Sequence, residues 1–297
     1  MPTAKLIVNP YAGRWAGRAA LPKVAETLRR LGYPFELVTT EGPDHAIALA
    51  RAAAEAGYSP IVAVGGDGTI SEVVNGLMEA AAGGVAGPLG VIPAGCANDL
   101  ARQLGLPLDV ATACRRLLAG SERVIDVGRV NGRYFVNDVG VGFEPQVTLE
   151  ARQIRWLRGT LVYLVAVFRA LRHLRQPHMT VEWDGGRASH PMPLVSVGNG
   201  NITGGFRLTP HARLDDGALD FVFAQRVTML QILRLLPGTL RGTHIHHPSV
   251  VTGRSTRLAV HSEEPVPLGV DGEVRTTGAQ DLSFEILPAR LRVIVGG

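Results

Sequence analysis

The residues from Ile61 to Asn75 combine side chains and spacing that suit phosphate binding. A short buried-strand pattern, Ile61–Val64, stops at the segment G-G-D-G-T (65–69), and an apolar helical pattern begins at Ile70. This order places backbone N–H groups and the positive end of a helix at the carboxyl edge of a sheet, where phosphate groups bind. Glycines leave no Cβ between ligand and backbone. On this segment alone, an ordinary tight turn with Thr69 as helix N-cap is an equally good interpretation.

Two further strand-to-loop junctions favour the functional interpretation. The strand pattern Leu6–Val8 runs into the polar segment N-P-Y-A-G-R (9–14), and Pro88–Ile92 runs into P-A-G-C-A-N-D (93–99), where a helix begins. In a parallel α/β sheet all three turns emerge on one edge, where ligands bind. The sequence therefore predicts a site for a phosphorylated ligand at that edge.

The composition is typical of a globular protein and narrows the classes of partner. The chain has 297 residues, of which 46% are hydrophobic and 19% charged, with a formal net charge of +4. This mild basic excess suits anionic partners such as a nucleotide or an acidic lipid surface. No basic patch is interleaved with aromatic residues, so nucleic acid is not expected as a partner. Two cysteines are too few for a disulfide framework or a zinc site.

The order of strand, helix and turn patterns along the chain predicts two domains, and the hydropathy pattern predicts a cytoplasmic protein. Up to about residue 120 strand and helix patterns alternate, which predicts a three-layer α/β domain with a parallel sheet over residues 1–124. From 125 to 289, short strand patterns and turns predict an antiparallel β-sandwich, interrupted by helical segments near 148–175 and 227–241. The Asn131-Gly132 pair predicts a hairpin. No signal-peptide pattern is present, and the longest apolar run, Leu161–Phe168, falls short of the roughly 20 residues that span a bilayer.

The motifs together resemble the diacylglycerol kinase catalytic-domain family. The resemblance rests on N-P-x-x-G (9–13), G-G-D-G-T with Glu72, P-x-G-x-A-N-D (93–99), L-D-D-G (214–217) and D-G-E (271–273), in this order and over nearly the whole chain. That family includes bacterial lipid kinases and diacylglycerol, sphingosine and ceramide kinases. The resemblance implies a first domain like those of NAD kinases and phosphofructokinases. It also implies a last strand, near 290–297, that returns to this domain.

The resemblance implies an ATP-dependent, Mg²⁺-dependent lipid kinase with a nucleotide site in the first domain. In this site Asp67 is the expected Mg²⁺ ligand and a catalytic residue, because Mg²⁺ prefers carboxylate and water oxygens. Glu72 is as well explained by a favourable charge near a helix N-terminus. Thr39 is expected to touch the nucleotide, with Thr40 as the alternative register. The expected nucleotide-binding residues are Asn9, Thr39, Gly65, Gly66, Asp67, Gly68, Thr69, Glu72, Gly95, Cys96, Asn98 and Asp99.

Cys96 departs from the family pattern, in which bacterial relatives usually have threonine. A thiol donates a weaker hydrogen bond than a hydroxyl. Either the backbone N–H at this position carries most of the contact, or the affinity for the nucleotide is reduced.

The resemblance also implies two functional features in the second domain, a general base and a bound metal ion. Glu273 is the expected general base, which would accept the proton of a lipid hydroxyl. On local evidence alone, a β-turn with an exposed glutamate is the better interpretation. A structural Mg²⁺ is implied at the L-D-D-G segment, held by the Asp216 carboxylate and the carbonyl oxygens of Arg213 and Ala218.

The acceptor side is less well defined by the sequence. The polar loop 199–205 suits a wall of the acceptor pocket. The helical stretch 148–175 carries arginines around its apolar run and could rest on an anionic membrane surface, although a core-packed helix with a solvated face is slightly favoured. These arginines are Arg152, Arg155, Arg158, Arg169, Arg172 and Arg175. Metal binding by the histidines of 244–247 is not favoured, since no acidic or cysteine partner is near in sequence.

Two other functions stay open at this point. One is a kinase of a soluble acceptor, as NAD kinases share the G-G-D-G segment, and the other is a non-catalytic nucleotide or lipid sensor. The oligomeric state is also open, with a homodimer as one alternative.

Overall fold

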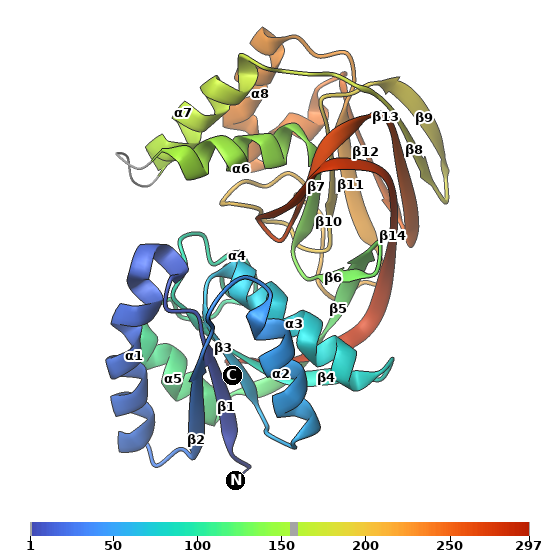
Figure 1. Ribbon diagram of the computed structural model, residues 1–297. Helices are drawn as coiled ribbons and strands as arrows, with labels where there is room; N and C mark the ends of the chain where they lie inside the picture. Colours follow the sequence, from blue (N-terminus) through green and yellow to red (C-terminus); the bar gives the residue numbers. More distant parts are fainter. Residues whose placement is uncertain (1, 155–159, 297) are drawn as a thin grey trace.

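The computed structural model describes residues 2–154 and 160–296 and shows two stacked domains joined by the long strand β14 (Figure 1). In the first domain the strand order β2-β1-β3-β4 is parallel throughout. Its strands are β1 (Ala4–Val8), β2 (Phe35–Thr39), β3 (Ile61–Gly65) and β4 (Ala86–Pro93). Its helices are α1 (Ala12–Arg30), α2 (His45–Glu55), α3 (Asp67–Ala81), α4 (Asp99–Gln103) and α5 (Val110–Ala119).

The helices of this domain cover both faces of the sheet. The α1 and α5 helices share one apolar cluster with the sheet, while α2 and α3 share another (Figure 1). Every residue of β3 is buried, as expected for a central strand covered on both faces. The three layers predicted from the alternating pattern are confirmed.

The C-terminal part of β14 (Glu273–Val295) lies in the first domain. Leu291 and Val293 pair parallel with β4, and residues 291–295 pair antiparallel with β5 (Ser121–Val130). The chain therefore crosses from one domain to the other in two strands, β5 and β14, which run side by side (Figure 1).

The second domain is an antiparallel sandwich, as predicted. The strand β13 (Arg257–Val270) bends between the layers, because its first half pairs with β8 and its last residues pair with β7. The buried rings of Phe221, Phe223 and Phe284 fill the space between the layers. The remaining strands are β6 (Arg133–Phe135), β7 (Asp138–Gly142), β8 (His178–Trp183), β9 (Gly186–Pro191), β10 (Leu194–Gly198), β11 (Leu219–Ala224) and β12 (Val250–Ser255).

Two tight hairpins in this domain have the same backbone signature. Both central residues have positive φ at Asn131-Gly132 (45° and 87°) and at Asp271-Gly272 (47° and 76°). This is the two-residue hairpin turn that Asn-Gly and Asp-Gly favour. The first confirms the predicted hairpin, and the second determines where β14, and with it Glu273, begins.

The helical region 148–175 differs from the single stretch expected. The described residues form two helices, α6 (Phe143–Gln153) and α7 (Thr160–Leu171). The residue after α6, Ile154, has an extended backbone. Arg155 and Arg158 lie outside the described residues. Together with α8 (Met229–Arg241), these helices form an apolar cluster of their own beside the sandwich (Figure 1). A short 3-10 helix (Thr243–His246) follows α8.

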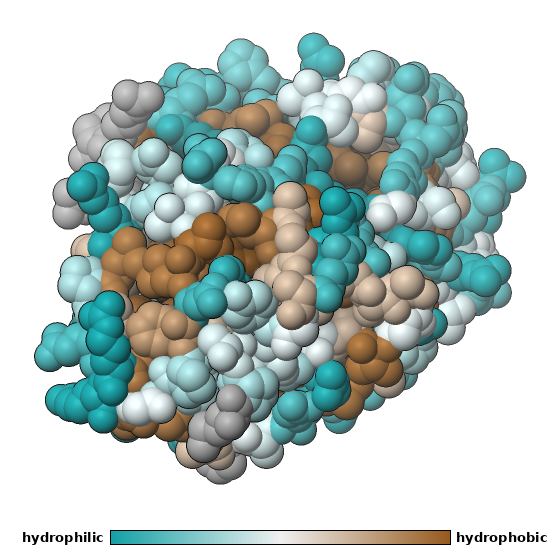
Figure 2. Space-filling view, turned by 60° about the horizontal axis from the view of Figure 1, so that its bottom comes forward, coloured by the Kyte–Doolittle hydropathy of each residue, from teal (hydrophilic) through white to brown (hydrophobic). Residues whose placement is uncertain are grey.

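The surface is hydrophilic over much of the face in Figure 2, where hydrophobic residues gather in a hollow that crosses the middle. Among the described helices, none has both the length and the apolar character required to cross a bilayer.

Asn75 connects the two domains, because its side chain forms hydrogen bonds with both backbone groups of Tyr134, as a neighbouring strand would. Its side-chain amide donates to the Tyr134 carbonyl at 2.9 Å and accepts from the Tyr134 N–H at 3.0 Å. The Asn75 side chain is buried on α3, and Tyr134 lies on β6 of the other domain.

Replacing Asn75 with leucine should lower the free energy of unfolding by about 2–4 kcal/mol, because two backbone groups of Tyr134 lose their partners. Urea unfolding measures this. Asn75→Asp keeps an acceptor for the Tyr134 N–H but turns a carboxylate toward the carbonyl oxygens of Ser71 and Tyr134, so near neutral pH it should lose at least as much. Equal stability of the leucine variant and the native protein would contradict the assignment.

Candidate active site

The glycine turn between β3 and α3 has the geometry expected of a phosphate cradle. The α3 helix begins at Asp67, with Gly66 at the N-cap, and no side chain caps its first N–H groups. Those N–H groups and the positive end of the helix are what an anion requires. A Cβ at Gly66 would come within 3.0 Å of the Gly95 Cα.

The three predicted loops do meet at one edge of the sheet. The Asn9 amide donates to the Thr69 hydroxyl at 3.2 Å. A Cβ at Gly13 would lie 2.6 Å from the carbonyl oxygen of Ala94, so the first loop packs closely on the third. Together with the Gly66–Gly95 contact, these contacts join the three loops into one continuous edge, which we call the rim.

In the structure Glu72 stabilises the start of the neighbouring helix α2. Its two carboxylate oxygens accept hydrogen bonds from the backbone N–H groups of Asp44 and Ala46, at 3.0 and 3.2 Å. The carboxylate therefore holds the N-terminus of α2, a neighbouring helix rather than its own. Thr39 is exposed at the end of β2, whereas Thr40 is buried, so Thr39 is the accessible hydroxyl of the two.

Asn98 and Asp99 shape the third loop. The Asn98 side chain accepts from the Gly95 N–H at 2.9 Å and donates to the Gly95 carbonyl at 3.2 Å. Asp99 reaches the other domain, where its carboxylate accepts from the N–H groups of Gly204 and Gly205 at 2.5 and 3.2 Å. Cys96, which follows Gly95 in this loop, is exposed. Asp99 thus connects the loop 93–99 of the first domain to the predicted acceptor loop of the second.

Asp67, the first residue of α3, is partly buried close to the carboxylates of Asp99 and Asp271. The backbone N–H of Leu100 donates to its Oδ1 at 3.3 Å. Burial, and then the charge of Asp99, raise the pKa of Asp67 to about 7. A carboxylate kept from water in this way is suited to a cation, although the described residues contain no cluster of three acidic, histidine or cysteine side chains that could hold a metal alone.

Glu273 lies against the glycine turn from the other domain. A Cβ at Gly68 would come within 2.8 Å of the Glu273 Oε1 atom, so the absence of a side chain at Gly68 makes room for the carboxylate. Glu273 also forms an ion pair with Arg152 at the end of α6, and both side chains are about half exposed. The sequence patterns gave no sign of this role for Arg152, because ion pairs across 121 residues leave no local spacing.

Asp271 fixes the turn that carries Glu273. Its buried carboxylate accepts from three consecutive backbone N–H groups, those of Val136, Asn137 and Asp138, at 3.2, 2.8 and 3.3 Å. Such a nest of donors holds the turn in one position.

The L-D-D-G segment is held by contacts other than a metal. The Asp216 carboxylate pairs with the Arg254 guanidinium, and Asp126 accepts from the Gly217 N–H at 2.7 Å. A cation at Asp216 would share the carboxylate with Arg254, so the expected site, with the carbonyls of Arg213 and Ala218, stays a prediction and carries no mechanistic step here. In the 3-10 helix, His244 is buried, with its Nε2 atom 3.1 Å from the Leu208 carbonyl oxygen.

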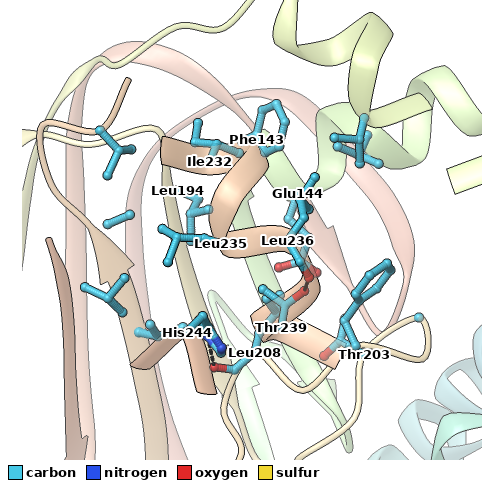
Figure 3. Close-up of a pocket in the computed structure, with 18 of the residues that line it drawn as sticks. Phe143, Glu144, Leu194, Thr203, Leu208, Ile232, Leu235, Leu236, Thr239 and His244 are labelled. Carbon is cyan, nitrogen blue, oxygen red and sulfur yellow. Dashed lines mark hydrogen bonds between the residues drawn. The ribbon is translucent and has the colours of Figure 1, made fainter. Parts of the chain in front are cut away.

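An apolar pocket opens beside this site in the second domain (Figure 3). Its walls come from α6, α7, α8 and the sandwich sheet, and they reach Thr203 and Gly204 of the acceptor loop and Gly272 of the Asp271 turn. Gly272 is adjacent to Glu273, so one end of the pocket lies next to the candidate base. The labelled wall residues in Figure 3 are Phe143, Glu144, Leu194, Thr203, Leu208, Ile232, Leu235, Leu236, Thr239 and His244.

Comparison with known proteins shows which family the chain belongs to. Residues 3–130 match the model of the diacylglycerol kinase catalytic domain, and residues 137–295 match the YegS C-terminal NAD kinase beta sandwich-like domain. The chain is similar to the diacylglycerol kinase of Bacillus subtilis, with 34% identity over 92% of this chain and 90% of that protein. The chain belongs to the diacylglycerol kinase family. As a member of this family it is an enzyme of the lipid kinase class.

Other relatives agree with this membership. The diacylglycerol kinase of Staphylococcus carnosus is 30% identical over 91% of this chain and 88% of its own length. A crystal structure of a diacylglycerol kinase from Bacillus anthracis has a TM-score of 0.79 at 24% identity, covering 99% of this chain and 97% of that chain. At this identity the crystal structure supports the fold alone.

The pKa of Asp67 predicts that the ligand-free protein loses stability as the pH rises. An aspartate titrates near 3.9 in the unfolded chain, so the folded state binds the extra proton between that value and about 7. The Asp67 contribution is complete below the unfolded pKa and is lost as the pH rises through the folded one. Between about pH 5 and about pH 7.5, this loss should be about 2–3 kcal/mol.

Urea unfolding of the native protein and of Asp67→Asn at both pH values measures this contribution. Subtracting the two pH dependences isolates Asp67 from the other titrating groups. Parallel pH dependence in the two proteins would show that Asp67 does not bind the extra proton in the folded state.

Proposed function

We propose that this protein transfers the γ-phosphate of ATP to the free hydroxyl of a diacylglycerol-like lipid, with Glu273 as general base. The observation that supports this most strongly is the position of Glu273. Its carboxylate lies against Gly68 of the glycine turn, and the residue before it, Gly272, lines the apolar pocket. The three groups that the reaction needs are therefore adjacent: an anion cradle, a base and an apolar acceptor site.

The residues around the glycine turn are of the types needed to bind the phosphates of a nucleotide and its Mg²⁺. The uncapped N–H groups of α3 and the close Gly66–Gly95 approach leave the backbone accessible to phosphate oxygens. When bound with the nucleotide, Mg²⁺ would neutralise charge on the phosphates, and Asp67 is the residue that would hold it, directly or through water. Asn9, Thr39 and Thr69 provide the polar contacts nearest the rim.

The residues of this chain provide the proton acceptor and the charge stabilisation that the phosphoryl transfer requires. Glu273 accepts the proton of the acceptor hydroxyl as its oxygen forms a bond to the γ-phosphorus, and the bond between that phosphorus and the bridging oxygen of ADP breaks. Arg152 lies on the Glu273 carboxylate, where a guanidinium can stabilise charge that develops on the transferred phosphoryl group. The products are ADP and a phosphorylated lipid.

Glu273→Gln should lower kcat by at least about 100-fold, because the amide cannot accept the proton. Binding of ATP should stay nearly unchanged, since the glycine turn is intact. Transfer of radioactive γ-phosphate to lipid and a fluorescent-nucleotide titration measure the two. Glu264→Gln, at an exposed position on β13, is the matched control. Near-normal turnover of Glu273→Gln would remove this residue from the mechanism.

The pocket favours a lipid over a soluble acceptor. Its walls are almost entirely apolar, which suits hydrocarbon chains and not a charged dinucleotide. Parallel phosphoryl-transfer assays with lipid extract, NAD and sugar phosphates distinguish a lipid kinase from a kinase of a soluble acceptor. Tight ATP binding without transfer to any acceptor would instead support a non-catalytic sensor.

The α7 and α8 helices have the properties of a surface that contacts an anionic membrane. They expose large apolar side chains and, with the adjoining segments 172–175 and 226, carry arginines without acidic residues between them. The exposed apolar residues are Leu164, Phe168, Met229, Leu230 and Leu240. The arginines are Arg169, Arg172, Arg175, Arg226, Arg234 and Arg241, and within the described residues none forms an ion pair.

These helices also roof the acceptor pocket, so a membrane at this face would lie next to the lipid site. Apolar side chains inserted at the interface and arginines near anionic headgroups both favour binding. We propose that the protein acts at the cytoplasmic surface of an anionic membrane through α7 and α8.

The double variant Phe168→Ser/Leu230→Ser should lose about 10-fold in affinity for vesicles, because two exposed apolar side chains no longer enter the interface. Co-sedimentation with vesicles of phosphatidylglycerol and phosphatidylcholine measures this, with the neutral lipid alone as reference. Leu37→Ser/Val85→Ser, at exposed positions of the first domain, is the control. The surface assignment is wrong if both double variants bind equally.

A further inference from the structure

One carboxylate of the first domain is paired with two arginines of the second. The Asp44 Oδ1 atom accepts hydrogen bonds from the Arg133 Nη2 atom at 2.9 Å and from the Arg275 Nη1 atom at 3.0 Å. Asp44 precedes α2, Arg133 begins β6, and Arg275 lies near the start of β14. We call these three side chains the Asp44 clasp. They have no task in the phosphoryl transfer described above.

The clasp forms because Asp44 is released from the role usual for its position. An aspartate at a helix N-cap ordinarily accepts hydrogen bonds from the first N–H groups of its own helix. At α2 the Glu72 carboxylate does this instead, and the Asp44 side chain makes no capping hydrogen bond. The Asp44 backbone is left-handed, with a φ of 60°, which aspartate adopts more readily than most residues. The side chain is therefore free to reach the other domain.

The two guanidinium groups depend on this carboxylate. Both arginine side chains are largely shielded from solvent. The Nε atom of Arg133 and the Nε and Nη2 atoms of Arg275 form no hydrogen bond within the described residues. Burial alone would raise the pKa of Asp44, but the two arginines outweigh it and hold that pKa below its ordinary value. Without the charged carboxylate, two like charges would face each other in a partly buried place.

Arg275 is linked to the candidate base by the shape of β14. Glu273 begins the strand, and Arg275 follows two residues later. Arg275 is the extra residue of a bulge, because Val274 and Thr276 on either side of it pair with adjacent residues of β13. A bulge redirects a side chain, and bulges are frequent beside active sites. The side chains of Glu273 and Arg275 thus extend from the same short piece of backbone.

The clasp fixes this piece of backbone to the first domain. The hydrogen bonds of the preceding turn go to residues 136–138 and therefore stay within the second domain. Glu273, however, must meet Gly68 of the first domain. Glu72 lies one turn after Gly68 on α3 and accepts from the Asp44 N–H, so Asp44 is held in a fixed relation to the glycine turn.

We propose that Asp44 is a positioning residue for the phosphoryl transfer, because by holding Arg275 it sets the distance between the Glu273 carboxylate and the glycine turn. This rests on the proposed function and deepens it, since it assigns to the first domain a residue that acts through the base of the second. A displacement of about 1 Å at a reacting group can slow a reaction about 100-fold. Loss of the clasp therefore lowers kcat, whereas nucleotide binding at the glycine turn stays intact.

The test exchanges the charges of the clasp. Asp44→Arg and Arg275→Asp should each lower kcat for dioleoylglycerol by at least about 10-fold, while the KM for ATP changes by less than about 2-fold. The double variant Asp44→Arg/Arg275→Asp again has one acidic and two basic side chains in the clasp. It should recover about half of the native kcat or more, because the two changes are coupled.

The ion pair of Lys5 and Glu36, within the first domain, provides the matched control. Its N–O distance is 2.9 Å and its side chains are 20% and 54% exposed, against 18% and 53% for Arg275 and Asp44. Glu36→Lys should leave kcat within about 2-fold of the native value. Titration with a fluorescent nucleotide counts the folded sites, and kcat is expressed per site.

Should the charge-reversal variants not fold, Asp44→Asn decides. It keeps an acceptor oxygen for the two arginines but no charge, and should lower kcat per site about 3-fold with an unchanged KM for ATP.

A native kcat per site in the reversal variants and in Asp44→Asn would overturn the assignment of Asp44. A double variant no faster than the single variants would also overturn it, since the effect would then not pass through the pair. The same holds if Glu36→Lys loses as much kcat as Arg275→Asp. Absence of transfer to any lipid by the native protein would instead overturn the proposed function itself.

Discussion

The buried carboxylate of Asp271 sets the geometry on which the cleft depends. By accepting three consecutive N–H groups of 136–138, it fixes the turn after β13 to the segment that begins β7. The next side chain but one, Glu273, is thereby directed at Gly68, where any Cβ would collide with it. A base from one domain and an anion cradle from the other are held together by a turn whose first residue, Asp271, is buried and fixed by three hydrogen bonds.

A second consequence of this arrangement is the concentration of acidic groups along the cleft. Asp67, Asp99, Asp138, Glu144 and Asp271 are each shifted upward in pKa, with burial as the largest cause in every case. Assembling them costs stability that a site without catalytic duties would not need to lose. Backbone N–H donors offset part of this cost at Asp67, Asp99 and Asp271.

Most of the first domain could be predicted from the sequence, because glycine turns between buried strands and helices leave local patterns. The meeting of the loops at 9–13, 65–69 and 93–99 followed from the parallel sheet alone. The tasks of Glu72 and Asp99 could not be predicted, since their partners are backbone N–H groups of α2 and of the loop at 204–205, far away in the chain. The break between α6 and α7 and the Arg152–Glu273 pair were missed for the same reason: each depends on tertiary contacts that no spacing records.

A crystal structure with Mg²⁺ and a non-hydrolysable ATP analogue tests the central geometry most directly. The account predicts the triphosphate along the 65–69 turn, with the γ-phosphorus about 6 Å from the Glu273 carboxylate, which leaves room for one hydroxyl oxygen between them. A triphosphate bound elsewhere would contradict the account. So would a Glu273 carboxylate that points away from the γ-phosphate while Asp271 still holds its turn.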